Sequence, residues 1–184
     1  MAIVHRITEQ EYIDLALEDS RLELWDGEPR EKPAMSSTHA VVSLYLAASL
    51  IAQLDKRSYL VNHNEGKARI SGSTYFIPDV IVVPANLITP HLGDPRHLAA
   101  WREPLPLVVE VWSPSTGAYD LQRKLTAYRE RGDHEIWYLQ PYDRILTTWR
   151  KHPVGTYDES VYTGGVVVVM SLPGVMIDLD DLLP

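Results

Sequence analysis

A chain of 184 residues, 45% of them hydrophobic and 23% charged, has an ordinary globular composition and a length that suits a single domain spanning residues 1–184. The absence of cysteine excludes disulfides, thiolate metal sites and thiol nucleophiles, and it fits a reducing cytoplasm. The formal net charge of -8 at pH 7 argues against a general nucleic-acid coating protein, although local basic patches can override it.

The first part of the chain predicts two helices separated by a hairpin. Thr8 is expected to cap a short helix, with Glu11 in the capping-box position. Residues 21–31 predict a hairpin, because the dipeptide Asp26-Gly27 readily adopts positive φ angles. Ser36 or Ser37 then caps a long helix. Apolar residues surround that helix almost completely and predict a central position with packing on several sides: Val41, Val42, Leu44, Tyr45, Leu46, Leu50, Ile51 and Leu54.

No segment predicts a signal peptide or a membrane span. The N-terminus has no basic region followed by an apolar one. The longest apolar stretch, residues 40–54, is interrupted by polar side chains and is shorter than the roughly 20 residues that a span needs. We therefore expect a cytoplasmic protein without a membrane partner.

The remainder of the chain predicts a mixed sheet of about six strands. The β-rich runs are residues 58–62, 67–70, 79–83, 107–112, 135–139, 145–149 and 166–170. Residues 120–131 predict a helix between two strands, capped by Asp120 and stopped at Gly132, which implies a right-handed crossover. The proline-bearing segment 88–106 predicts a long loop. The pattern predicts an α/β (α+β) fold with a mixed sheet flanked by helices.

Glu110 is the most unusual polar residue of the predicted sheet. In the run LVVEVW, strand alternation places it on one face between Val108 and Trp112. An ionised carboxylate buried there without a partner costs several kcal/mol, so it needs a cation, a donor network or protonation. A metal ion is the obvious candidate, and a salt bridge to Arg123 or Lys124 is the alternative.

Asp79 opens a second β-rich run, DVIVV, where the preceding proline keeps the chain extended. Its carboxylate can converge with that of Glu110 across neighbouring strands. Taken alone, Asp79 has the more common interpretation of a strand-end acid hydrogen-bonded to a loop. Lys124 lies at the edge of the apolar stripe of its helix and can reach toward the sheet, or its stem can pack there while the ammonium reaches water.

Basic residues cluster in the second half of the chain, and the clusters have two interpretations. They form a local nucleic-acid-binding patch, or they form a solvated face with ion pairs such as Arg129 with Asp133. The members are Arg123, Lys124, Arg129, Arg131, Arg144, Arg150 and Lys151.

Several segments carry a family resemblance: RLELWDGE, SSTHA, IPDVIVV, LVVEVWSPST, YDLQRKLTAYRERG and EIWYLQP. Together they resemble the Uma-two family of putative restriction endonucleases, which belongs to the PD-(D/E)XK nuclease superfamily. The resemblance extends from about residue 8 to residue 183. It implies a restriction-endonuclease-like fold, DNA as a partner, and hydrolysis of phosphodiester bonds with Mg²⁺ (or Mn²⁺) as cofactor.

The resemblance also implies which residues act. It assigns the catalytic, metal-binding acids to Asp79 and Glu110 and a further metal ligand to the backbone carbonyl of Val111. The superfamily's lysine, two residues after the second acid, is replaced here by Trp112. The resemblance implies that Lys124, on the following helix, takes its catalytic place.

Three further positions match or depart from the family pattern. Glu23 matches another acid and is a candidate third metal ligand, direct or through water, although an exposed hairpin acid is the alternative. His39 also matches, yet a structural role is more common for a lone histidine near a helix start. The family often has aspartate where Gln140 stands, which leaves any role of that acid in doubt.

Two functions of different kinds are compatible with these residues. The first is a metal-dependent endonuclease. The resemblance alone adds the expectation that it acts as a homodimer. The second is a catalytically inactive nuclease-fold module that binds nucleic acid or protein, which the net acidity and Trp112 favour. A serine hydrolase is set aside, because the sequence has no G-x-S-x-G motif. Without metal, at least one of Asp79 and Glu110 is expected to have a raised pKa.

Overall fold

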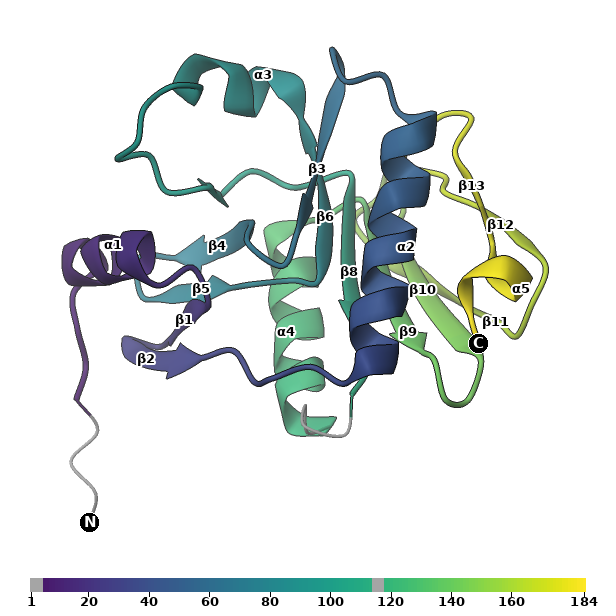
Figure 1. Cartoon of the computed structure of the whole chain (residues 1–184), viewed down its shortest axis with the longest axis horizontal. Coiled ribbons are helices and arrows are strands. Elements are labelled where there is room, and N and C mark those ends of the chain that lie inside the picture. Colours follow the sequence, from purple (N-terminus) through teal and green to yellow (C-terminus); the bar gives the residue numbers. More distant parts are fainter. Residues whose placement is uncertain (1–4, 114–117) are drawn as a thin grey trace.

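The computed structural model describes residues 5–113 and 118–184. These residues form a six-stranded sheet, a five-stranded sheet and a two-stranded ribbon, with helices packed against them (Figure 1). None of the described helices is both long and apolar enough to cross a membrane. The expected mixed sheet flanked by helices is therefore confirmed, but several predicted strands lie in different sheets.

The six-stranded sheet has the order β11-β10-β9-β8-β6-β3. Its strands are β3 (Tyr59–His63), β6 (Val80–Pro84), β8 (Leu107–Val111), β9 (Glu135–Gln140), β10 (Ile145–Lys151) and β11 (Tyr157–Tyr162). Strands β8 and β9 pair in parallel, as the helix between them requires, and the other pairs are antiparallel. Strand β11 was not predicted.

The five-stranded sheet has the order β2-β1-β5-β4-β7 and packs beside the first sheet. Its strands are β1 (Leu22–Trp25), β2 (Glu28–Glu31), β4 (Lys67–Ser71), β5 (Thr74–Phe76) and β7 (Ala100–Trp101). The ribbon pairs β12 (Val166–Val168) with β13 (Met176–Asp178). The prediction of one sheet was thus incomplete, because β4 and β12 pair outside it and β5, β7 and β13 are too short to show a period.

Local signals at the helix and hairpin ends predicted these elements correctly. Thr8 caps α1 (Glu9–Glu18), and its side chain and that of Glu11 form the reciprocal capping box. Asp26 and Gly27 both have positive φ in the turn between β1 and β2. Ser36, rather than Ser37, caps α2 (Ser37–Gln53) through its side chain.

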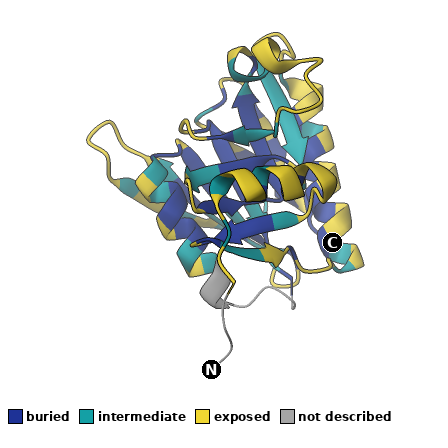
Figure 2. Cartoon of the chain, turned by 90° about the vertical axis from the view of Figure 1, so that its left-hand side faces the viewer, coloured by how far each residue is buried: buried dark blue, intermediate teal, exposed yellow. Residues whose placement is uncertain are grey.

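Two helices cover opposite sides of strands β6 and β8 (Figure 1). Helix α2 packs with Val80, Val82 and Val109, whereas α4 (Ala118–Arg131) packs with Ile81 and Val108. Figure 2 shows the buried residues concentrated in the strands of the interior. The remaining helical segments are short: α3 (Ala85–Ile88), the 3₁₀ turn η1 (Thr89–His91) within the predicted 88–106 loop, and α5 (Leu179–Leu182).

Two helix predictions were wrong. Helix α2 packs on one side only, since Leu44, Tyr45 and Ile51 are more than half exposed, at 52%, 58% and 61%. An apolar residue does not report burial by itself, because much of a folded surface is apolar. Asp120 does not cap α4, because that helix begins at Ala118.

Gly66 is required where β4 starts, next to the six-stranded sheet. A Cβ atom at this position would lie 2.5 Å from Ile81 Cδ1 and 2.9 Å from Asn62 Cβ. Gly66→Ala is therefore expected to lower the free energy of unfolding by about 1–3 kcal/mol, measured by urea denaturation. Gly72→Ala is the matched control, because its Cβ would meet only the flexible Glu9 side chain, at 3.2 Å. Equal midpoints for the two variants would contradict this packing.

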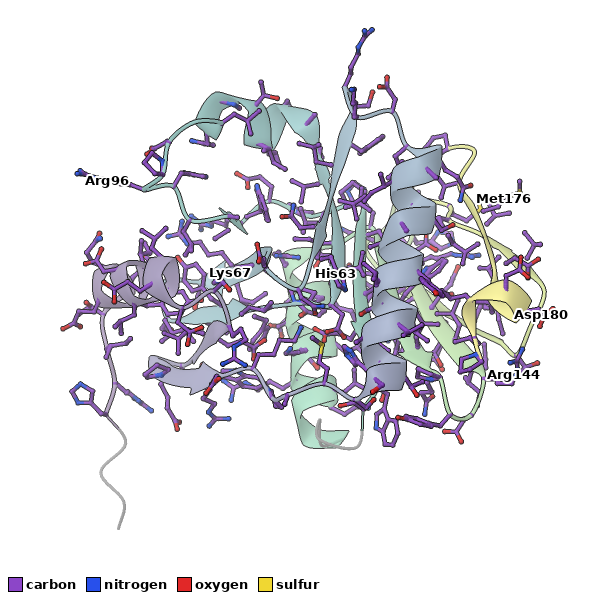
Figure 3. All side chains as sticks on the ribbon, viewed as in Figure 1. His63, Lys67, Arg96, Arg144, Met176 and Asp180 are labelled. Atoms are coloured by element: carbon purple, nitrogen blue, oxygen red, sulfur yellow. The ribbon has the colours of Figure 1, made fainter. Side chains whose placement is uncertain are left out.

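Lys67 is buried at 1% exposure, with its ammonium donating to the Ser20 carbonyl at 2.8 Å (Figure 3). Burial lowers the pKa of Lys67 from 10.5 to about 8. Below about pH 8 the folded state carries the full cost of this buried charge, and the cost is relieved as the pH rises toward 10.5, where the unfolded lysine also loses its proton.

Lys67→Met is therefore expected to be more stable than the wild type at pH 7 by about 1–2 kcal/mol, after allowance for the lost hydrogen bond. The difference should shrink as the pH rises to 10, which urea midpoints at several pH values will measure. Lys56→Met, at an exposed position, provides the control. A stability difference that does not change with pH would contradict the assignment.

Candidate functional site

A single pocket gathers acids, lysines and a histidine from six parts of the chain. Its charged and imidazole side chains come from β1, the segment after β2, the first turn of α2, the entrance to β6, β8 and α4: Glu23, Lys32, His39, Asp79, Glu110 and Lys124. Its apolar walls include Trp25, Pro33, Met35, Trp112, Leu121 and Tyr138. The pocket therefore combines acids, cations and aromatic side chains.

The pairing of β6 with β8 positions the two predicted acids. Val80 lies opposite Val109, so Asp79 and Glu110 follow as the next cross-strand neighbours. The Asp79 amide donates to the Val109 carbonyl at 3.0 Å and continues the ladder by one residue. Directly opposed residues of an antiparallel pair have Cβ atoms about 5 Å apart, and both acids line the same pocket.

The Asp79 carboxylate is fully buried and accepts three hydrogen bonds. Lys32 Nζ donates to Oδ1 at 2.7 Å, whereas the Val111 amide at 2.6 Å and His39 Nε2 at 3.0 Å contact Oδ2. Burial alone would raise the pKa of Asp79, but Lys32 and His39 outweigh burial and hold the pKa well below its usual range. Asp79 is thus an ionised acid at neutral pH.

Lys124 bridges the other two acids of the pocket. Its Nζ lies 2.9 Å from Glu23 Oε1 and 3.3 Å from Glu110 Oε1. Burial alone would lower the pKa of Lys124, but Glu110 and Glu23 outweigh burial and raise the pKa above its usual value. Lys124 therefore reaches inward as a permanently charged ammonium. Of the two residues named as alternative salt-bridge partners of Glu110, Lys124 makes the ion pair, whereas Arg123 pairs with Asp26.

Glu110 and Glu23 are held differently. Tyr128 donates its hydroxyl to Glu110 Oε1 at 2.6 Å, and burial raises the pKa of Glu110, with Lys124 opposing the rise and repulsion from Asp79 adding to it. The prediction that one of the paired acids has a raised pKa is confirmed for Glu110. Glu23 is 3% exposed, which excludes the exposed-acid alternative, and its oxygens accept from the Ile77 amide and the Trp25 indole at 2.7 and 2.9 Å.

Sequence reasoning missed Lys32 and ranked His39 low. Lys32 stands between a hairpin and a helix cap, where no periodicity marks a residue as buried. His39 matched a family segment, and only the fold reveals that its ring reaches Asp79 from the first turn of α2. Val111 lines the pocket, and its amide donates to Asp79 Oδ2. The role of its carbonyl as a metal ligand stays a prediction.

The predicted basic clusters are largely neutralised within the described residues. Arg131, not Arg129, pairs with Asp133, at 2.7 Å, while Arg129 lies over the Trp149 ring. The four-residue spacing of Arg129 and Asp133 predicts an ion pair only if both residues lie on one helix. Asp133 lies beyond the end of α4, so this prediction was wrong. Arg144 pairs with Asp180 near the C-terminus (Figure 3). Gln140 ends β9 and is not among the pocket residues.

The donor chemistry of the pocket fits a hard divalent cation, but the ligands are not assembled as a cluster. Within residues 5–113 and 118–184, no three histidine, aspartate or glutamate side chains are grouped to hold a metal ion. Lys32 and Lys124 instead contact the carboxylates. Three acids face these two ammonium groups, so the carboxyl groups of the pocket outnumber its lysines by one. Carboxylate oxygens are ligands that Mg²⁺ and Mn²⁺ prefer.

The comparisons with known proteins agree with this architecture. The Uma2 family model, described as "Putative restriction endonuclease", matches residues 9–180. The chain belongs to this family. The family resemblance of the sequence segments is thus confirmed, and restriction-endonuclease-like families generally use divalent metals.

A solved structure supports the fold of this Uma2 protein. It is described as a "putative nuclease belonging to DUF820" from Anabaena variabilis ATCC 29413, and it is 16% identical, with a TM-score of 0.77. The match covers 96% of this chain and 97% of that chain, which shows a common fold over nearly the whole length. None of the curated proteins matches this sequence.

Proposed function

We propose that this Uma2 protein is an endonuclease that hydrolyses phosphodiester bonds of DNA with Mg²⁺ or Mn²⁺, and that Asp79, Glu110 and Lys124 are its catalytic residues. The observation that carries the proposal is the convergence of two cross-strand acids and a helix-borne lysine in one pocket. Convergence of these groups is what hydrolysis of a phosphodiester requires, because charge develops on the phosphate in the transition state. Family membership supports the same reaction class.

Asp79, Glu110 and the Val111 carbonyl would hold the metal. A divalent cation, when bound, supplies charge that stabilises the phosphate in the transition state and makes water a better nucleophile. Asp79 is held in position by the Val111 amide and His39, and Glu110 by Tyr128. These contacts fix both carboxylates before any ligand arrives, which lowers the cost of reorganisation during the reaction.

Lys124 is proposed to orient the attacking water or to contact the phosphate oxygens. Its ammonium is held by Glu23, whose remaining contacts come from Trp25 and the Ile77 amide. Glu23, first considered as a metal ligand, is better suited to position Lys124, because its oxygens already accept these bonds; metal contact through water is compatible with this role.

Wild-type protein incubated with linear and supercoiled DNA tests the proposal directly. Cleavage is expected with Mg²⁺ or Mn²⁺ and no cleavage with a chelator, read on gels over a range of enzyme concentrations. The second candidate is a DNA-binding module without activity. It is favoured by the ion pairs that Lys32 and Lys124 make with Asp79 and Glu23, because these lysines already neutralise acids of the pocket. DNA binding without cleavage in either metal would establish it and reject hydrolysis. A homodimer acting on both strands, a single domain over residues 1–184 and a cytoplasmic location belong to the same proposal.

A further inference from the structure

Lys32 is the cation of the pocket to which the proposed mechanism gives no role. It belongs to the segment between β2 and α2 and is 8% exposed. Its Nζ lies 2.7 Å from Asp79 Oδ1 and 3.1 Å from Asn64 Oδ1. A lysine buried to this extent normally serves as a counter-charge, and Asp79 is the acid that it neutralises.

The two oxygens of Asp79 have different partners. Oδ2 is occupied by the Val111 amide and His39, both of which belong to the framework of β8 and α2. Oδ1 contacts Lys32, a residue of neither a strand nor a helix, whose ammonium stands at the end of a flexible side chain. A divalent cation bound by Asp79 therefore competes with Lys32 for Oδ1. The two positive charges would lie within a few ångströms of each other in a buried pocket, where their repulsion is strong.

The second partner of Lys32 cannot replace the first. Asn64 is held by its own contacts, because its amide donates to the Asp79 carbonyl at 2.9 Å and its side chain meets His63 at 2.8 Å. The Asn64 side chain is neutral, however, so it offers a hydrogen bond but no counter-charge to a displaced ammonium. A buried ammonium that loses its acid needs another anion nearby. In a pocket that receives nucleic acid, the phosphate is that anion.

We propose that Lys32 is an exchangeable cation, which pairs with Asp79 in the metal-free protein and with a phosphate of the nucleic acid when a divalent cation occupies Oδ1. This inference rests on the proposed function. It predicts that metal and nucleic acid strengthen each other's binding. The metal releases Lys32 from Asp79 so that it can pair with the phosphate, and the phosphate supplies the anion that the displaced Lys32 needs. The bare pocket would then hold metal weakly, and the substrate would complete the site.

The first test measures Mn²⁺ binding without nucleic acid. Lys32→Met is expected to bind Mn²⁺ at least about tenfold more tightly than the wild type by calorimetry, because the competing charge is gone. Lys32→Gln keeps a hydrogen-bond donor for Asp79 and Asn64 without the charge. It is expected to show the same increase in Mn²⁺ affinity, and it replaces the methionine variant if that variant folds poorly. Lys32→Arg is expected to restore weak binding. Lys56→Met, at an exposed position, is the matched control and should resemble the wild type.

The second test repeats the titrations with a short phosphorothioate DNA oligonucleotide, which resists cleavage. The DNA is expected to tighten Mn²⁺ binding by about tenfold or more in the wild type and in Lys32→Arg, and to have a much smaller effect in Lys32→Met and Lys32→Gln. Unchanged Mn²⁺ affinity in both uncharged variants would overturn the exchange, provided that the wild type binds Mn²⁺ through Asp79. Mn²⁺ binding that survives Asp79→Asn would instead overturn the proposed function, so the two failures are distinct.

Discussion

Asp79→Asn is expected to remove both metal-dependent cleavage and the stabilisation of the fold by metal. Asparagine has nearly the same shape, but it lacks the charge that attracts a divalent cation and the second acceptor oxygen. With metal at ten times its dissociation constant, the wild type gains about 1.4 kcal/mol, or about 3–6 °C in melting temperature for a protein of this size. The variant is expected to show no metal-induced shift and at least a hundredfold slower cleavage, roughly the size of effect seen when charge stabilisation is lost.

The same substitution leaves the buried Lys32 without its acid, which costs about 3–5 kcal/mol of folding free energy. Circular dichroism at the assay temperature must therefore show a folded variant. Glu110→Gln provides a second reading, because the pKa of Glu110 is already raised and the neutral amide is a smaller change. Asp143→Asn, on the exposed turn after β9, is the matched control. A metal-induced shift of wild-type size in Asp79→Asn would reject this aspartate as a ligand.

Lys124→Met is expected to slow cleavage by about a hundredfold or more and to leave most of the metal-induced stabilisation intact. The methionine fills the space of the lysine stem, while the charge between Glu23 and Glu110 is lost. A residue that acts mainly in the transition state lowers the rate without preventing metal from binding. Single-turnover cleavage and thermal shifts with Mn²⁺ separate these two effects.

Controls for Lys124 must exclude a purely structural role. Lys124→Arg keeps the charge and is expected to recover part of the rate, whereas Lys56→Met should cleave like the wild type. If Lys124→Met and Lys124→Arg both fail to fold, Lys124 is a structural counter-charge for the two acids. If Lys124→Met folds and cleaves at the wild-type rate, the enzyme proposal stands without this residue.

The sequence was informative wherever a signal is local. Strand alternation predicted that Glu110 is flanked by apolar neighbours and in need of a partner, and Lys124 was correctly identified as one candidate. The capping box at Thr8 and the Asp26-Gly27 turn are likewise set by a few adjacent residues. Such signals survive folding because their contacts lie within one or two turns of chain.

Contacts between distant segments were not predictable in the same way. Lys32 and Asp79 are 47 residues apart, and their ion pair depends on how the hairpin and β6 are placed by the whole fold. Strand pairing also depends on the whole fold, because the sequence of a short β-rich run does not determine which other run it pairs with. The division into two sheets, and with it the arrangement of the pocket, therefore required the structure.

In the proposed mechanism, Trp112 occupies the position two residues after Glu110, and the cation of the site comes from another element. With the lysine on the strand, the pocket position two residues beyond the second acid is fixed by electrostatic need. Here the cation arrives from α4, and position 112 carries a half-buried ring in edge contact with Tyr142, at 5.7 Å between centroids. That position is thus free to vary in size and shape while the charges of the site stay constant. Under the proposed mechanism, a substitution at Trp112 would therefore change the shape of the pocket wall without removing a charge from the site.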